Sequence, residues 1–177
     1  MLPPRSGAAQ HRARRAERTP GVLFVQPRRR PGSGRPAAEP EGNREMNFPR
    51  IESTALLVVD LQERLVPAMN NPCPVLDRSR LLLRGMAELG VDVLVTEQYP
   101  KGLGGTVPEI AELLPESSPP IAKTGFSAFV EPAFRTALAA KPRKTLVVAG
   151  IEAHVCVLQT VFDALNEGFE VILAADA

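Results

Sequence analysis

The chain has 177 residues, 44% of them apolar, so it is long enough for one globular domain with a substantial core. Its formal net charge of +1 hides an uneven distribution. Residues 1–45 hold ten Arg against four Glu, a balance of +6, whereas the remainder holds eleven Lys or Arg against sixteen Asp or Glu, a balance of −5. This composition predicts no nucleic-acid partner for the domain, and no apolar run approaches the roughly 18 residues of a membrane span.

Residues 1–45 are rich in Arg, Pro, Gly and Ala, which predicts a disordered N-terminal extension. Its one apolar cluster, residues 22–25, is too small to build a core. A transit peptide and an arm that binds RNA or membranes are alternatives. We favour either a plain extension or an artefact upstream of a natural start at Met46, and therefore assign the folded domain to residues 46–177.

Apolar runs alternate with helical patterns along this domain. The runs predict strands at residues 54–59, 91–96, 146–149 and 170–174, with a short strand or extended segment within residues 119–129. Helical patterns fall at residues 75–89, 131–140 and 158–165, and residues 97–105 form a mobile loop. The alternation predicts an α/β fold with a mainly parallel sheet. Since such sheets usually continue further, we expect the C-terminal strand and helix to be missing.

Cys156 lies where a helix begins after a buried strand. Free backbone N–H groups and the positive end of the helix dipole favour the thiolate there. A buried core cysteine is an equally open interpretation. The other cysteine, Cys73, lies in a predicted turn, so the pair makes no disulfide framework and a reducing, cytoplasmic location is expected.

Two charged residues accompany Cys156 at predicted strand ends. Asp60 is the first polar residue after the strand at 54–59, on the edge where open α/β sheets bind ligands, although, taken alone, a helix N-cap is the favoured explanation for it. Lys123 lies near Phe126 and Phe129 and is either partly desolvated or a plain surface lysine. Together the three residues form a chemical set: a nucleophile, a proton acceptor and a stabilising charge.

Three segments carry a resemblance to a known family. They are residues 55–62 (Ala-Leu-Leu-Val-Val-Asp-Leu-Gln), residues 121–129 (Ile-Ala-Lys-Thr-Gly-Phe-Ser-Ala-Phe) and residues 150–157 (Gly-Ile-Glu-Ala-His-Val-Cys-Val). In this order they resemble the isochorismatase-like (cysteine) hydrolase superfamily over about residues 53–177. The resemblance implies a Rossmann-like three-layer fold and a catalytic triad of Asp60, Lys123 and Cys156. It also implies a cis peptide between Ile151 and Glu152 that directs the Glu152 and Cys156 N–H groups at an oxyanion.

The chain departs from the nicotinamidases of this superfamily. Those enzymes bind a metal through an Asp-Trp-His-Pro segment and a further His, whereas residues 97–102 here read Glu-Gln-Tyr-Pro-Lys-Gly. His154 is the one histidine from Met46 onward, so no metal and no cofactor are expected. The sequence is more similar to the uncharacterised isochorismatase-domain branch.

The leading hypothesis is a cofactor-independent hydrolase that acts on a small amide-like or related substrate. Gln62, Tyr99 and Phe126 are candidate substrate-binding residues, and Gln62 is equally suited to orienting or capping the segment after Asp60. The alternative is an inactive or truncated member of the fold that serves as an oligomeric scaffold, and a third idea is nucleic-acid binding by the Arg-rich arm. A homo-oligomer with a small-molecule substrate is expected in the leading case.

Overall fold

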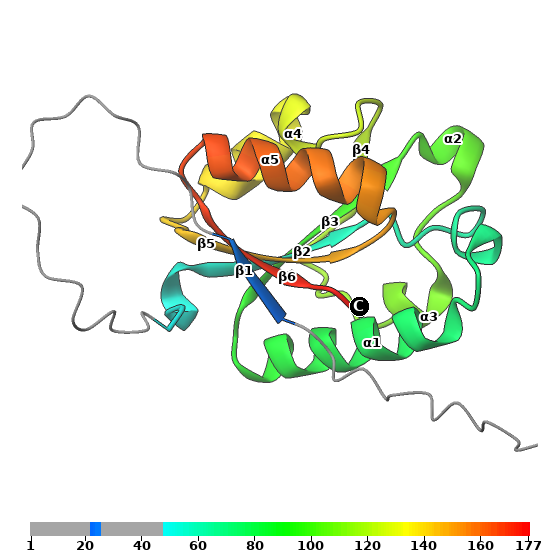
Figure 1. The fold of residues 1–177 in the computed structure, drawn as a ribbon, viewed down its shortest axis with the longest axis horizontal. Coiled ribbons are helices and arrows are strands. Elements are labelled where there is room, and N and C mark those ends of the chain that lie inside the picture. Colours follow the sequence, from blue (N-terminus) through cyan, green and yellow to red (C-terminus); the bar gives the residue numbers. More distant parts are fainter. Residues whose placement is uncertain (1–21, 26–47) are drawn as a thin grey trace, which may run out of the picture.

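The computed structural model describes residues 22–25 and 48–177, which form a six-stranded sheet with helices on both faces (Figure 1). The strands lie in the order β1-β6-β5-β2-β3-β4. Their bounds are β1 Val22–Val25, β2 Thr54–Val59, β3 Asp92–Gln98, β4 Ile121–Lys123, β5 Thr145–Gly150 and β6 Glu170–Ala174. All neighbouring pairs are parallel except β1 and β6. The predicted α/β fold class with a mainly parallel sheet is confirmed.

The helices make the two outer layers of this three-layer arrangement. They are α1 Cys73–Glu88, α2 Pro100–Leu103, α3 Pro108–Ala111, α4 Pro132–Ala139 and α5 Leu158–Asn166. Helices α4 and α5 cover one face of the sheet, while α1 and α3 cover the other (Figure 1). Within the described residues, no helix is long and apolar enough to cross a membrane.

Strand β2 forms the centre of the core because every one of its residues is buried. Side chains alternate across a strand, so Ala55, Leu57 and Val59 face the cluster beneath α4 and α5, while Leu56 and Val58 face the cluster over α1. A strand that is buried on both faces reads as a continuous apolar run, which is why the sequence identifies it.

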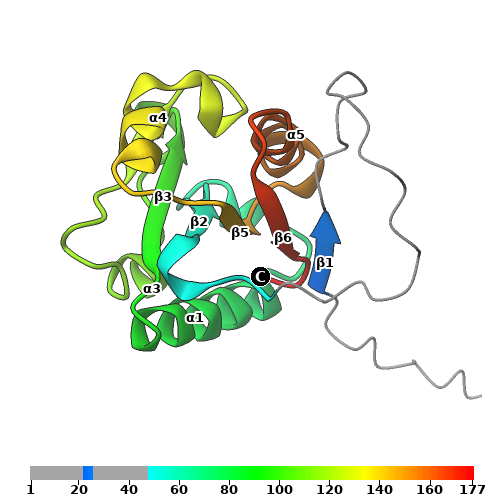
Figure 2. The same cartoon turned by 90° about the vertical axis from the view of Figure 1, so that its left-hand side faces the viewer.

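Strand β1 is an element that the sequence analysis did not expect. Residues 1–21 and 26–47 of the predicted disordered extension lie outside the described part of the chain. The expectation is wrong for Val22–Val25, which pairs antiparallel with β6 from Val22 opposite Ala174 to Val25 opposite Val171 (Figure 2). A short apolar segment that cannot form a core can still pair with the N–H and C=O groups along a sheet edge.

Two helix starts also differ from the predictions. Cys73 begins α1 rather than lying in a turn before it. A single π-helical turn, Ala153–Val157, precedes α5, so Cys156 lies in this turn rather than at the start of the α-helix. One-turn π segments are often found at functional sites.

The central parallel strands end along one edge of the sheet, where the candidate site lies. Asp60 directly follows β2, Gln98 and Lys123 are the last residues of β3 and β4, and Gly150 ends β5. Gly150 has a φ of 109°, and a Cβ there would collide with the Val59 carbonyl oxygen. Only glycine therefore allows β5 to approach β2 so closely at this edge.

Candidate active site

Asp60 places a carboxylate at the centre of the carboxyl edge. The residue has a left-handed backbone with φ of 52°, and it is fully buried. Its Oδ1 accepts a 2.8 Å hydrogen bond from the Thr96 hydroxyl. The N-cap interpretation does not hold, because the first α-helix after Asp60 begins at Cys73. A non-glycine residue in this conformation persists only where its surroundings impose it, and such residues concentrate at functional sites.

Lys123 brings a cation to the same carboxylate from β4. Its Nζ lies 2.7 Å from Asp60 Oδ2, and neither side chain is exposed to solvent. Nζ also donates hydrogen bonds to Gln98 Oε1 at 2.6 Å and to the Phe126 carbonyl at 3.0 Å. The interpretation as a plain surface lysine is therefore wrong. No donor among the described residues is aligned for a hydrogen bond to Oδ2, so this oxygen is held by charge and keeps a lone pair free.

Gln98 is a site residue that the sequence analysis missed. Its Oε1 faces the Lys123 ammonium, and its Nε2 donates a 2.9 Å hydrogen bond to the Thr124 carbonyl, so both ends of the amide are oriented. The same Oε1 lies 4.0 Å from Cys156 Sγ. Apolar patterning ended the strand at residue 96, which put Gln98 in a loop. Its position directly after a buried run was the one signal that pointed to it.

Cys156 is buried beside this pair, on the face of the sheet that α5 covers. Burial and the neighbouring Asp60 carboxylate together raise the pKa of the thiol to about 11, against an opposing effect of Lys123. The expectation that Cys156 rests as a thiolate is therefore wrong. Desolvation and a neighbouring carboxylate outweigh the Lys123 charge, so the resting group is a thiol.

The turn before Cys156 contains a cis peptide bond between Ile151 and Glu152, as the family resemblance implied. The Glu152 N–H donates no hydrogen bond within the described residues. The Glu152 carboxylate lies 3.6 Å from Nδ1 of His154, whose side chain is 77% exposed. The imidazole thus belongs to the surface of the turn.

The three candidate substrate-binding residues lie in different surroundings. Gln62 is fully buried, and its amide atoms bond the backbone of Gln98 and Gly104, so it offers no free group to a substrate. Tyr99 is exposed and lines a cavity of about 250 Å³ along β4 that neither Asp60 nor Cys156 lines. Phe126 is half exposed, and it contacts the site through its carbonyl oxygen.

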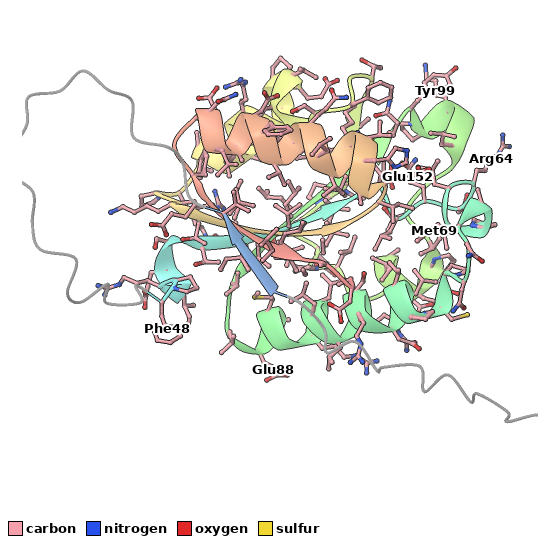
Figure 3. All side chains as sticks on the ribbon, in the orientation of Figure 1. Phe48, Arg64, Met69, Glu88, Tyr99 and Glu152 are labelled. Carbon is pink, nitrogen blue, oxygen red and sulfur yellow. The ribbon has the colours of Figure 1, made fainter. Side chains whose placement is uncertain are left out.

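The surface end of the site can be followed in the side-chain view. Figure 3 shows Tyr99, Arg64, Met69 and Glu152 together at one end of the molecule, away from Phe48 and Glu88. A second cavity of about 390 Å³ lies at this end, between the segment that contains Met69 and the turn that contains Glu152. Asp60 and Lys123 are fully buried, whereas Tyr99 is 55% exposed.

The chain matches a known domain family over most of its length. The isochorismatase domain model matches residues 54–177. Isochorismatase domain-containing protein 1 of Salmo salar is 41% identical over 126 residues, which cover 71% of this chain and 44% of that protein. The chain therefore spans less than half the length of this relative.

Solved structures give the same picture. The MAR1 ribonuclease of Caenorhabditis elegans has a TM-score of 0.64 and 40% identity over 68% of this chain and 62% of its own. YcaC of Pseudomonas aeruginosa, solved with hexane-2,5-diol and covalent acrylamide, has a TM-score of 0.60 and 31% identity over 68% of this chain and 61% of its own. YcaC of Escherichia coli, described as an octameric hydrolase of unknown specificity, has a TM-score of 0.59 and 28% identity over 68% and 60%. The domain match, together with the fold, shows that this chain belongs to the isochorismatase-domain family.

Proposed function

We propose that this chain is a cofactor-independent hydrolase that cleaves a small amide-like substrate. In this proposal Cys156 is the nucleophile, Asp60 is the general base and acid, and Lys123 is the stabilising charge. One observation carries the proposal: a single buried carboxylate, Asp60, contacts the Lys123 ammonium at 2.7 Å, and its negative charge raises the pKa of the neighbouring Cys156 thiol. A nucleophile, a base and a cation that act on one another are the parts that nucleophilic catalysis needs.

Because the pKa of Cys156 is raised, its thiol needs a base, and Asp60 is the proposed one. A thiol with a pKa of about 11 carries very little thiolate at neutral pH, so the proton must leave as the sulfur attacks. In the first step Sγ forms a bond to the amide carbon while the thiol proton passes to Asp60. The C–N bond then breaks, and Asp60 returns the proton to the leaving amine, which leaves a thioester on Cys156. Water attacks the thioester in the last step with Asp60 again taking its proton. The C–S bond then breaks to release a carboxylic acid, and Asp60 returns the proton to the Cys156 sulfur.

In this scheme Lys123 stabilises charges and takes part in no covalent step. Its ammonium lies against the carboxylate that gains and loses the proton, and its charge lowers the pKa of the Cys156 thiol. Backbone N–H groups of Glu152 and Cys156 are the proposed oxyanion hole, since the turn that contains them runs beside the sulfur. Donors aimed at a developing oxyanion contribute strongly in a site that excludes water.

The relatives add two points of support. The structure of the Pseudomonas protein with covalent acrylamide indicates a nucleophile in a homologue that reacts with a small unsaturated amide. The octameric Escherichia protein supports a homo-oligomer for this chain. The nematode protein is called a ribonuclease, but residues 46–177 carry five more acidic than basic side chains, which does not favour a polyanionic substrate.

The test is ammonia release from a panel of small primary amides. We expect release by the full chain and by Cys73→Ser, and none by Cys156→Ala. Asp60→Asn should lower turnover by about 10²–10⁴-fold, the usual contribution of a general base. Release that persists in Cys156→Ala would refute a thiol nucleophile. Absence of release across the panel, with RNA also uncleaved, would favour the scaffold alternative.

A further inference from the structure

Gln62 is a buried side chain that ties together three segments of the carboxyl edge. Its Oε1 accepts the Gln98 N–H at 2.6 Å, and its Nε2 donates to the Gln98 carbonyl at 3.0 Å and to the Gly104 carbonyl at 2.7 Å. Its own N–H donates to the Asp60 carbonyl at 2.8 Å. The segment after β2, the end of β3 and the loop around Gly104 thus meet at Gln62.

This amide is already bound to the protein backbone. A primary amide offers two N–H donors and a carbonyl oxygen with two lone pairs, and here both donors and one lone pair have backbone partners. The side chain is also fully buried. Gln62 therefore works on the protein backbone rather than on a substrate.

The backbone that Gln62 holds is that of Gln98, whose side chain stands between two groups of the site. Gln98 Oε1 lies 2.6 Å from Lys123 Nζ and 4.0 Å from Cys156 Sγ. Because Gln62 bonds both the N–H and the C=O of Gln98, it limits rotation of the backbone there, and the direction in which the side chain leaves the strand depends on it. Two hydrogen bonds at one residue act as a bidentate clamp.

The same residue anchors the loop that follows β3. Next to Gln62, the Glu63 N–H donates to the Gly105 carbonyl at 3.0 Å and the Arg64 N–H donates to the Leu103 carbonyl at 3.1 Å. The loop was expected to be mobile, but these bonds hold it against the segment after Asp60. The bond from Gln62 to Gly104 lies between them and is the one that comes from a buried side chain.

We propose that Gln62 is a positioning residue that acts through Gln98: it holds the Gln98 backbone so that the side-chain oxygen of Gln98 stays between the Lys123 ammonium and the Cys156 thiol. The inference concerns the assembly of the site, so it does not depend on which bond the site cleaves. It predicts that loss of the Gln62 amide and loss of the Gln98 amide have the same effect on Cys156.

The direction of that effect follows from the charges around the thiol. The groups that act on Cys156 are Asp60, which raises its pKa, and Lys123, which lowers it. Gln98 Oε1 presents a partial negative charge to the thiol and occupies one donor of Lys123. Removing this oxygen leaves the ammonium more available to a thiolate, so the thiol pKa should fall. Each unit of that fall raises the thiolate fraction at pH 8 about tenfold.

The experiment is a double-mutant cycle on Gln62→Met, Gln98→Met and the double variant, in the full chain. Iodoacetamide alkylation of Cys156 is followed against pH by peptide mass spectrometry, with the exposed Cys73 in the same sample as reference. We expect both single variants to shift the Cys156 midpoint downward, and the double variant to match either single one, since residues that act in series are not additive. Gln159→Met on the exposed face of α5 serves as the matched control and should leave the midpoint unchanged.

Three outcomes would overturn the inference. The first is an unchanged midpoint in Gln62→Met while Gln98→Met shifts it, and the second is a double variant whose shift is the sum of the two. Equal alkylation rates for Cys73 and Cys156 would mean that Gln62→Met has unfolded. The comparison then passes to Gln62→Glu, which keeps the size of the side chain and the acceptor for the Gln98 N–H. Unfolding of this variant too is the third outcome, because it would assign Gln62 to overall stability instead of to position.

Discussion

The Asp60 carboxylate and the Lys123 ammonium form an ion pair that solvent does not reach, with Oδ2 and Nζ 2.7 Å apart and both side chains 0% exposed. Removing two charges from water is unfavourable, and their mutual attraction offsets this only when the geometry is good. A buried pair is therefore weak evidence for stability. Its position next to the Cys156 thiol makes it evidence for chemistry, since strongly perturbed titratable groups gather at functional sites.

Replacing one partner of this pair should be costly. Lys123→Met leaves the Asp60 carboxylate buried without its cation, and we expect a loss of about 3–5 kcal/mol in the free energy of unfolding. Urea denaturation measures it. Lys101→Met, on an exposed residue, is the control and should change stability by less than about 0.5 kcal/mol. A loss below about 1 kcal/mol for Lys123→Met would show that the pair is not buried as described.

The pH dependence of Cys156 follows from its raised pKa. Because that pKa lies at about 11 rather than at the ordinary value of 9.0, the thiol should stay protonated through neutral and mildly alkaline pH. Iodoacetamide alkylation of Cys156 should therefore rise only as the pH approaches about 11. Asp60→Asn removes the negative charge of the carboxylate but keeps the positive charge of Lys123, so the midpoint of Cys156 alkylation should move to lower pH. A wild-type midpoint at or below pH 9.0, the ordinary value, would contradict this environment.

Gly150 and Gly85 make a matched pair of alanine substitutions. Gly150 has a φ of 109° and faces the Val59 carbonyl oxygen, so Gly150→Ala should cost more than about 2 kcal/mol of unfolding free energy. Gly85 lies within α1 with open space around its Cα, and Gly85→Ala should raise stability by about 0.5–1 kcal/mol. Thermal unfolding of both variants checks this. Equal effects would mean that β5 does not approach β2 as closely as the structure has it.

Two phenylalanines on the same side of the sheet should differ in how much their replacement by Ala lowers stability. Phe134 of α4 is fully buried and packs edge-on against Phe129 with ring centroids 5.2 Å apart. Phe134→Ala should cost about 3–5 kcal/mol. Phe162 of α5 is 58% exposed, and Phe162→Ala should stay within about 0.5 kcal/mol. Chemical denaturation measures both losses of stability. A larger loss for Phe162→Ala than for Phe134→Ala would contradict the described packing.

Phe162 also shows that apolar spacing alone does not identify which residues of a helix are buried. The helical pattern at residues 158–165 rests partly on the apolar spacing of Leu158 and Phe162, but both are exposed, and α5 buries Thr160 and Ala164. Small residues are favoured here because the helix lies close to its neighbours, and the Thr160 hydroxyl accepts the Ala128 N–H. Hydrophobicity along one segment does not report such contacts across the chain. The buried strands, in contrast, were recognisable because a short continuous apolar run is typical of a strand that is covered on both faces.

Some residues of the candidate site could likewise be predicted from the sequence, and others could not. Asp60, Lys123 and Cys156 were predicted because each follows or ends an apolar run, and parallel topology brings such positions to one edge. Gln98 was missed because its importance rests on a contact with Lys123 from another strand. The protonation of Cys156 was predicted wrongly for a related reason. The local helix terminus can be inferred from the sequence, but the burial and the neighbouring Asp60 charge that raise the thiol pKa belong to the tertiary structure.

The most direct test of the central claim compares the two cysteines as nucleophiles at neutral pH. The full chain is treated with p-nitrophenyl acetate, and acetylation of Cys156 and Cys73 is followed by peptide mass spectrometry. The buried Cys156 thiol, with its pKa of about 11, should be acetylated faster than the exposed Cys73 only if Asp60 removes its proton and the site stabilises the oxyanion. We predict this order, and its loss in Asp60→Asn. Faster acetylation of Cys73, with Cys156 unmodified, would contradict a catalytic role for the buried thiol.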